Sequence, residues 1–299
     1  MRDTRARLIL NPGAGSAVRE EVETQLGDRV EIRLTEAPGD ATRLAREAVE
    51  EGVSLVVAGG GDGTLHEVVN GLLPEPRGTV CGLLPLGTGN DFARTLALPA
   101  DIAEWATVLE AGRTLDLDAI RVEGPFDPRW AINGVAGGAI DRLDEKMTAE
   151  LKRFWGPLSY LRATAEALPD LEPFRIEAVF DDGEPIAASV HSVVAANGRT
   201  LAGGIPIAPG ADPADGRMDC VLVTAVEGLE IVTLGGKVLL GAHLEDERVL
   251  FRRARSLSVT SDPPMAFHAD GERLDGAWAR LTLHPGVLPM LVGPEAAES

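Results

Sequence analysis

The segment of this chain best suited to chemistry is a glycine-rich turn, Gly59-Gly60-Gly61-Asp62-Gly63-Thr64, which follows an apolar run and precedes a helical pattern. Glycines in such a turn let the backbone bend tightly and bring N–H groups against a phosphate. An anion at the start of the next helix would also meet free N–H donors and the positive end of the helix dipole. The pattern favours a phosphate site over a tight connection without a ligand. It is neither a P-loop, which ends in Gly-Lys-Ser/Thr, nor a Rossmann fingerprint.

Two similar turns follow other apolar runs. Asn11-Pro12-Gly13-Ala14-Gly15-Ser16 comes after the first run, and Leu86-Gly87-Thr88-Gly89-Asn90-Asp91 comes after a later one. The carboxyl ends of parallel strands lie at one edge of a sheet, where ligands bind. Three such turns therefore predict one site. Thr64 and Glu67 have the spacing of a capping box, which would specify the start of the helix.

Carboxylates are the second group of residues that could do chemistry. Asp62 lies inside the glycine turn, where a functional role is favoured over ordinary turn capping. Asp270-Gly271-Glu272 has the form of a hairpin turn, and turn carboxylates are usually solvated. From its residues alone, Glu272 is therefore explained more simply as a hairpin residue than as a catalytic one. Five histidines are scattered without the spacing of metal ligands, and we assign none of them a role: His66, His191, His243, His268 and His284.

The elements that must position these residues fall into two regions. Over residues 1–113, apolar runs alternate with helical patterns, which predicts a parallel sheet covered by helices on both faces. We expect Asp40 to cap the second helix of this domain. The expected strands are 7–10, 30–34, 54–58 and 81–85, and the expected helices are 17–26, 40–52, 66–73 and 103–109.

From residue 114 to residue 299, short strands separated by turn signals predict a second, mainly β domain in the form of a sandwich. A terminal segment could cross back to the first domain. The expected strands are 116–122, 130–135, 175–180, 189–196, 218–223, 257–260, 265–268, 280–284 and 287–292, and the expected helices are 143–168 and 229–243.

The excess of acidic over basic residues limits the kinds of partner that the protein can bind. The 299 residues include 47 acids and 28 bases, which gives a formal net charge of −19, and the lysines are Lys146, Lys152 and Lys237. Nucleic-acid binding depends on dense Lys and Arg, so we expect no nucleic-acid partner. The same balance argues against general docking on anionic membranes. Because no segment has the pattern of a signal peptide or a bilayer span, we expect a soluble, cytoplasmic protein.

Taken together, the motifs GGGDGT, NPGAGS, GTGNDFAR and Asp270-Gly271-Glu272 resemble the catalytic fold of the diacylglycerol kinase family. The chain looks most similar to soluble bacterial lipid kinases related to diacylglycerol and sphingosine kinases. The resemblance spans nearly the whole chain and includes Gly203-Gly204 and Asp215-Gly216. It implies an α/β ATP-binding domain, a β-sandwich domain, and a cleft between them that holds ATP, Mg²⁺ and a lipid.

The resemblance also implies roles for single residues. Glu272, with Asp270 in the same motif, would form the catalytic pair, and Glu272 would take the proton from the acceptor hydroxyl. Asp62 would serve the nucleotide–Mg²⁺ site. A structural metal would use the Asp215 side chain and nearby carbonyls, here of Asp212 and Arg217. The implied ATP contacts are Asn11, Pro12, Gly13, Ala14, Gly15, Ser16, Thr35, Gly60, Gly61, Asp62, Gly63, Thr64, Glu67, Thr88 and Asn90.

Two positions depart from the family pattern. Ala14 stands where relatives often carry Ser, which removes a hydroxyl that could contact a phosphate, and Gly89 stands where they often carry Ala. Phosphoryl transfer depends mainly on positioning and on charge neutralisation, and backbone N–H groups can hold phosphates in a chain with few lysines. Neither departure removes the implied catalytic set.

We therefore expect an ATP- and Mg²⁺-dependent lipid kinase that phosphorylates a hydroxyl of diacylglycerol or a related lipid. The alternatives are an NAD kinase, which shares GGDGT but not the other motifs, and a catalytically silent nucleotide-binding regulator. Basic clusters at 152–155 and 248–255 suggest transient contact with a membrane surface. A homodimer is left open.

Overall fold

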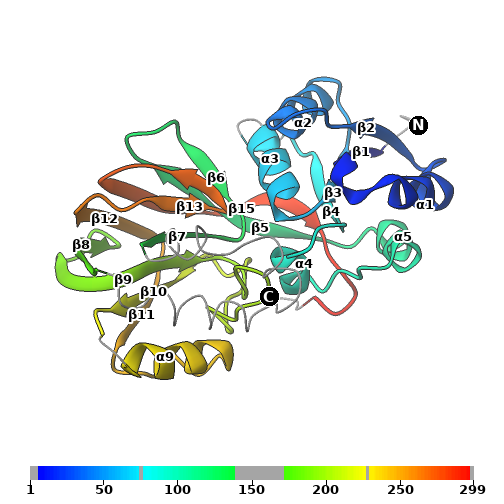
Figure 1. The fold of residues 1–299 in the computed structure, drawn as a ribbon. Coiled ribbons are helices and arrows are strands. Elements are labelled where there is room, and N and C mark those ends of the chain that lie inside the picture. The colour runs from blue at the N-terminus through cyan, green and yellow to red at the C-terminus, as the bar shows by residue number, and fades with distance from the viewer. Residues whose placement is uncertain (1–5, 74–76, 139–171, 227–228, 297–299) are drawn as a thin grey trace.

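A computed structural model describes residues 6–73, 77–138, 172–226 and 229–296 (Figure 1). Two parts lie side by side, an α/β part and a strand-rich part. In the α/β part, parallel strands follow one another across the sheet in the order β2 (Val30–Leu34), β1 (Ala6–Leu10), β3 (Leu55–Gly60) and β4 (Val80–Pro85). Strands β1, β3 and β4 are almost continuously buried, which is typical of a sheet that is covered on both faces.

Helices cover both faces of this sheet. On one face, α2 (Asp40–Glu50) and α3 (Asp62–Leu72) share an apolar cluster with the strands. On the other face, α1 (Ser16–Leu26) and α5 (Ile102–Ala111) share a second cluster with them. Strands β1, β3 and β4 each contribute to both clusters because successive side chains point to opposite faces. The expected α/β architecture is confirmed. The turn Pro12–Ala14 forms a short 3₁₀ helix, and α4 (Asp91–Thr95) follows the third glycine turn.

The strand-rich part surrounds an apolar core of its own, and its strand pairs are antiparallel. One helix of this part, α9 (Leu229–Leu239), lies at its lower edge in Figure 1. The strands are β5 (Thr114–Glu123), β6 (Arg129–Ala131), β7 (Gly134–Gly138), β8 (Phe174–Phe180), β9 (Ile186–Ala196), β10 (Met218–Thr224), β11 (Val249–Ala254), β12 (Ser256–Asp262), β13 (Phe267–Ala269), β14 (Glu272–Leu274) and β15 (Trp278–Leu291).

Strand β15 links the two parts. It pairs antiparallel with β5 and β12, and near its end Met290 pairs in parallel with Cys81 of β4. The expected strands 280–284 and 287–292 are this single strand, whose register shifts between His284 and Leu288. The C-terminal strand therefore joins β4, the outer strand of the parallel set, to the strand-rich part.

Other expectations needed correction. The expected strand 130–135 is divided into β6 and β7, because the intervening backbone N–H groups of Ile132 and Asn133 donate to Asp270 rather than to a strand. Strands β11 and β14 were not expected. Helix α3 begins at Asp62 rather than at 66, so part of the glycine motif is already helical. The expected helix 143–168 lies outside the described residues.

Candidate active site

The glycine turns after β1 and β3 meet around a cavity of about 500 Å³. Several expected ATP contacts line it, together with Glu36, Ala37, Pro38 and Ala41. The expected contacts Gly13, Gly15, Ser16, Gly60 and Asp62 lie on these two turns without lining the cavity. Thr88 and Asn90 lie on the third glycine turn, after β4, and Thr88 is exposed to solvent. The expected contacts that the structure brings together here are Asn11, Pro12, Thr35, Gly61, Gly63, Thr64 and Glu67.

Close backbone approach explains the glycines of these turns. A Cβ atom on Gly60 would lie 2.3 Å from the Thr64 hydroxyl oxygen, and one on Gly87 would lie 2.4 Å from the Cα of Gly61. A side chain at either position would push the turns apart. Asn90 holds the third turn closed, because its amide oxygen accepts the Gly87 N–H at 3.0 Å and its amide nitrogen donates to the Gly87 carbonyl at 2.8 Å. Asn90 thus shapes the turn from within it.

Asn11 connects the first turn to the second. Its backbone N–H donates to the Gly59 carbonyl at 2.9 Å, and its amide nitrogen lies 3.4 Å from the Thr64 hydroxyl. Its amide oxygen accepts the Gly13 N–H at 2.8 Å. The cavity therefore has a preorganised wall of backbone and amide groups, which suits an anion without lysine.

Both capping expectations were wrong. Gly61 is the N-cap of α3, and no side chain caps that helix start. Asp40 is the first residue of α2, and its carboxylate accepts N–H groups of the preceding turn. Glu67 instead accepts the N–H groups of Gly39 at 3.0 Å and Ala41 at 3.1 Å, so it stabilises the start of the neighbouring helix. A local spacing rule missed this contact because the donors come from α2.

Asp62 joins the second turn to the third. Its carboxylate accepts the N–H groups of Asp91 at 3.1 Å and Phe92 at 3.2 Å, which are the first residues of α4. Burial raises the pKa of Asp62, and these two hydrogen bonds oppose that shift. A carboxylate has about four lone-pair sites, so Asp62 keeps acceptor capacity on both oxygens. Oxygen donors of this kind fit Mg²⁺.

The residues expected to hold a structural metal lie elsewhere, in the loop before β10. Asp215 accepts the Arg217 N–H at 2.9 Å, and its other oxygen pairs with the guanidinium of Arg253. Asp212 accepts the Ala214 N–H at 3.0 Å. Within residues 6–73, 77–138, 172–226 and 229–296, no group of three or more His, Cys, Asp or Glu side chains is arranged to hold a metal. The loop remains rich in oxygen donors, but Arg253 already neutralises Asp215.

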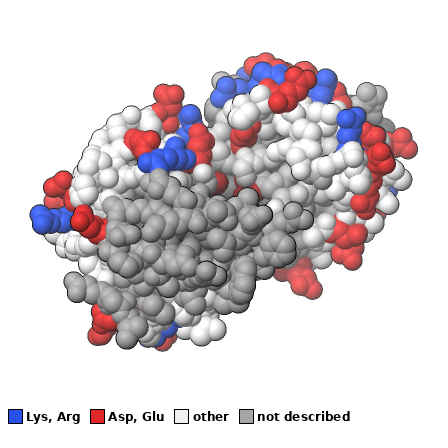
Figure 2. Space-filling model, in the orientation of Figure 1, with Lys and Arg blue, Asp and Glu red and all other residues white. Residues whose placement is uncertain are grey.

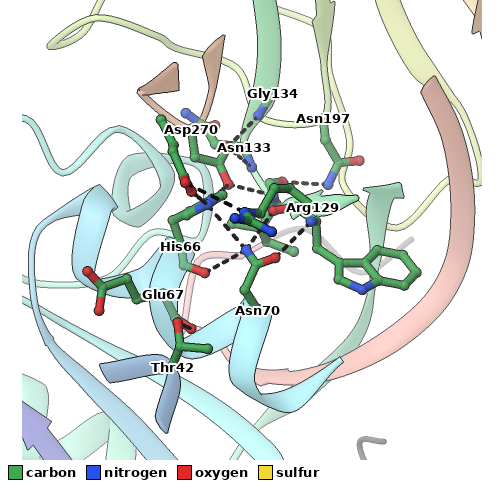
Figure 3. A network of polar contacts seen from close by, with 12 residues as sticks. Thr42, His66, Glu67, Asn70, Arg129, Asn133, Gly134, Asn197 and Asp270 are labelled. Carbon is green, nitrogen blue, oxygen red and sulfur yellow. Dashed lines mark hydrogen bonds and ion pairs between the residues drawn. The ribbon is translucent and has the colours of Figure 1, made fainter. Parts of the chain in front are cut away.

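The expected catalytic pair meets the α/β part at a buried histidine. His66 of α3 places Nδ1 3.2 Å from Oδ2 of Asp270 and Nε2 2.7 Å from Oε2 of Glu272. Asp270 also accepts backbone N–H groups from Ile132 at 2.8 Å and from Asn133 and Gly134 at 2.9 Å (Figure 3). The Asp270 side chain is 1% exposed, whereas that of Glu272 is 44% exposed. One carboxylate is thus a fixed anchor, and the other faces solvent.

This geometry shifts the pKa values of His66 and Glu272. Burial opposes a charge on His66, but its hydrogen bonds to Asp270 and Glu272 outweigh burial and raise the pKa of His66 to about 9. The hydrogen bond from His66 lowers the pKa of Glu272, and the charge of Arg129, whose Nε lies 3.5 Å from Glu272, acts in the same direction. Glu272 is therefore ionised at neutral pH, as a proton acceptor must be.

Three residues of this junction were not expected: His66, Asn70 and Arg129. Asn70 fastens α3 to β6, since its amide oxygen accepts the Trp130 N–H at 2.9 Å and its amide nitrogen donates to the Trp130 carbonyl at 2.9 Å. A signal for two of them exists in the sequence. Asp62, His66 and Asn70 recur every four residues and so share one face of a helix that is otherwise mostly buried and apolar.

Comparisons with known proteins agree with this arrangement. Residues 5–122 match the diacylglycerol kinase catalytic domain, and residues 134–292 match the YegS C-terminal NAD kinase beta sandwich-like domain. A diacylglycerol kinase of Bacillus subtilis is 30% identical, with 94% of each chain covered. This chain belongs to the diacylglycerol kinase family. The resemblance inferred from its motifs is confirmed, and so is the combination of an α/β domain with a β-sandwich-like domain.

Other relatives of this diacylglycerol kinase family member cover nearly its full length. A "probable lipid kinase YegS-like" protein of Xanthomonas oryzae pv. oryzae is 34% identical over 95% of this chain and 97% of its own. A solved structure of a candidate diacylglycerol kinase from Bacillus anthracis superposes with a TM-score of 0.81 at 26% identity, over 98% and 97% of the two chains. An NAD kinase from Archaeoglobus fulgidus shares the fold alone, with a TM-score of 0.57 at 13% identity over 97% and 95%. Among the described residues, no helix is long and apolar enough to cross a membrane.

Proposed function

We propose that this protein is an ATP- and Mg²⁺-dependent lipid kinase that phosphorylates a hydroxyl of diacylglycerol or a related lipid. The observation that carries this proposal is the placement of α3. Its first residues, Gly63 and Thr64, line the glycine-turn cavity, and His66, two positions later, contacts Glu272 of the other part. A phosphate donor held at the turns would therefore lie close to a carboxylate able to accept a proton.

The donor side of the site uses backbone groups. The helix start at Asp62 offers N–H donors and the positive end of the α3 dipole to a polyphosphate. Asp62 would hold the magnesium ion, which neutralises phosphate charge when bound. The NAD kinase that shares this fold was solved in complex with ATP, which supports nucleotide as the donor here.

The acceptor side centres on Glu272. The acceptor hydroxyl gives its proton to the Glu272 carboxylate while its oxygen bonds to the γ-phosphorus. The bond from that phosphorus to the β–γ bridging oxygen breaks, and ADP leaves. The transition state of phosphoryl transfer is loose in most analyses, so the base need not be strong. Because Glu272 is half-exposed, it can pass the proton on to solvent.

The identity of the acceptor follows the relatives' names, diacylglycerol kinase and lipid kinase. An NAD kinase is the weaker alternative, because the likeness to that class is limited to fold at 13% identity. A silent nucleotide-binding regulator is disfavoured, since Asp62, Asp270 and Glu272 are all present and Glu272 is accessible.

Contact with lipid would be transient. Acidic and basic side chains are interspersed over the described part of the face in Figure 2. In the basic cluster 248–255, Arg248 pairs with Asp246 and Arg253 pairs with Asp215, so both are partly neutralised. The cluster 152–155 lies outside the described residues. A weak surface encounter fits this distribution better than stable residence on an anionic membrane.

A direct transfer assay tests the proposal. The protein, radiolabelled ATP and Mg²⁺ are incubated separately with dispersed diacylglycerol, with NAD and with a total lipid extract. We expect label in diacylglycerol or in one lipid of the extract, and none in NAD. Label in NAD would replace the proposal with the NAD kinase alternative, and ATP binding without any transfer would support the regulator.

A further inference from the structure

His66 is the contact between the glycine-turn helix and the carboxylate turn of the other part. Its side chain is 5% exposed, and its two ring nitrogens reach Asp270 and Glu272, which follow it by 204 and 206 residues in the chain. Figure 3 shows the ring directed toward Asp270, with Asn133 and Gly134 behind that carboxylate. A buried side chain with two long-range polar partners is held in one rotamer.

The partners of His66 determine its protonation. Asp270 is already the acceptor of three backbone N–H groups, so it is an ionised carboxylate and takes a further donor from Nδ1. The amide nitrogen of Asn70 also lies 3.3 Å from Nε2 of His66, but its two hydrogens have closer acceptors, the carbonyls of His66 and Trp130, each at 2.9 Å. Nε2 therefore has Glu272 as its hydrogen-bond partner, and it must donate to that ionised carboxylate. With protons on both nitrogens, His66 is an imidazolium.

This contact leaves the two oxygens of Glu272 unequal. Oε2 is held by His66 at 2.7 Å, whereas Oε1 lies 3.5 Å from Arg129, a longer and weaker contact. A base whose orientation is fixed by a third group is a recurring feature of catalytic constellations. Oε1 is consequently the oxygen that can meet an acceptor hydroxyl.

We propose that His66 is a positioning residue for phosphoryl transfer: as an imidazolium anchored on Asp270, it holds Oε2 of Glu272 and so aims Oε1 at the acceptor hydroxyl. This inference rests on the proposed function. The acceptor proton passes to Oε1 as the new oxygen–phosphorus bond forms, and His66 keeps both of its protons throughout. Because His66 and the cavity-lining Thr64 lie on one helix, the same element positions the phosphate donor and the proton acceptor.

The charge on His66 has a second consequence. ATP brings several negative charges toward Glu272, and nearby negative charge favours protonation of a carboxylate. The imidazolium opposes that effect and keeps Glu272 ionised. The charged groups that act on His66 are Asp270, in the turn between β13 and β14, and Glu272, the first residue of β14. Arg129 of β6 lies beyond Glu272, and Asp62 lies one turn earlier on α3.

Steady-state kinetics of His66→Gln test the proposal, with dispersed diacylglycerol or the acceptor found in the transfer assay. Misaligned reacting groups cost on the order of a hundredfold, so we expect kcat to fall roughly ten- to a hundredfold. KM for ATP should stay close to that of the wild type. The acid limb of the kcat–pH profile should move to higher pH. The loss of kcat near pH 9 that we expect in the wild type should be absent in the variant. His243→Gln is the matched control, since His243 is also buried and its Nε2 atom lies 2.9 Å from the Ile207 carbonyl rather than from a carboxylate.

The protonation state of His66 gives a readout that is independent of activity. In ¹⁵N NMR of histidine-labelled wild-type protein, we expect His66 doubly protonated at pH 7.5, and Glu272→Gln should lower its titration point. A neutral His66 at pH 7.5 overturns the proposal, even if His66→Gln does not fold. An active wild type whose His66→Gln variant keeps kcat and both pH limbs also overturns it. A charged His66 in a wild type that transfers no phosphate would instead refute the kinase function and leave the ion contact standing.

Discussion

Two groups of carboxylates in the described part of the chain differ in what neutralises them. At the junction of the two parts, Asp270 and Glu272 share the imidazole of His66, and Glu272 remains half-exposed. In the loop before β10, Asp215 pairs with Arg253. Buried Asp118 of β5 contacts that loop: its carboxylate accepts the N–H groups of Gly216 in the loop at 2.7 Å and of Gly286 in β15 at 2.8 Å.

This difference indicates a chemical role for the junction cluster and a structural role for the loop cluster. The loop cluster satisfies its carboxylates with backbone N–H groups and with an arginine of β11, all from the strand-rich part or from β15. The junction cluster needs a residue of α3 and ends on an accessible oxygen. Carboxylates whose hydrogen bonds are all made within the protein stabilise a loop. A carboxylate such as Glu272, with one oxygen held by His66 and the side chain partly exposed, can react with a substrate.

Asp270→Asn should have the largest effect on stability. The amide cannot accept three N–H groups and a histidine, and it leaves the imidazolium with a weaker partner. Breaking a buried ion pair costs on the order of 3–5 kcal/mol, and we expect the free energy of unfolding to fall by about 4 kcal/mol, with a large loss of kcat. Urea unfolding monitored by circular dichroism measures the change in the free energy of unfolding. An unchanged midpoint would mean that Asp270 does not anchor the junction.

The second-largest effect should be a loss of stability at high pH, which comes from His66 at the junction cluster. The pKa of His66 is raised from 6.5 to about 9, so its stabilising contribution is fully present below pH 6.5 and is lost as pH rises through about 9. Each pKa unit corresponds to about 1.4 kcal/mol, which sets an upper limit of about 3 kcal/mol on this loss. Thermal unfolding between pH 6 and pH 10 should show the decrease in wild type and a smaller one in His66→Gln. If the stability of the two proteins decreased equally with pH, His66 would not be the group responsible for the decrease.

Asp118→Asn should disturb the loop cluster without affecting chemistry. One of the two N–H groups would face the amide nitrogen of the variant, and an unsatisfied buried donor costs about 1–3 kcal/mol. Burial raises the pKa of Asp118, with Asp215 and Asp212 adding to the shift, so part of the cost is offset by removing a buried charge. We expect a loss of about 2 kcal/mol in the free energy of unfolding and an unchanged kcat. A large fall in kcat would place this loop in the mechanism.

Arg253→Gln should have the smallest effect. The side chain of Arg253 is 44% exposed and that of Asp215 is 25% exposed, whereas its other partner, Asp219, is buried. An exposed ion pair contributes about 0–1 kcal/mol, and the buried partner puts Arg253 at the upper end of that range. We expect a loss of about 1 kcal/mol at low salt, part of which disappears in 1 M NaCl because salt screens exposed charges. If Asp215 binds a structural metal once Arg253 is gone, thermal stability of the variant should rise with added Mg²⁺ while that of wild type does not.

Sequence patterns predicted the elements better than the contacts between them. The apolar runs before Asn11, Gly61 and Leu86 located the strands and their glycine turns, because burial on both faces leaves a strong local signal. The role of Glu67 was missed because its partners lie on α2. His66 was missed because its partners are more than 200 residues away. The break between β6 and β7 likewise depends on Asp270, which nothing local reveals.

Glu272→Gln gives the most direct test of whether the carboxylate at the junction accepts the acceptor proton. The substitution keeps the shape of the side chain and removes its ability to take a proton. Transfer from radiolabelled ATP should fall by about 10²–10⁴-fold, the usual contribution of a general base. ATP binding, followed by calorimetry on the same sample, should be unchanged. Turnover equal to that of wild type would remove Glu272 from the mechanism, and loss of ATP binding would show that its role is in holding the nucleotide.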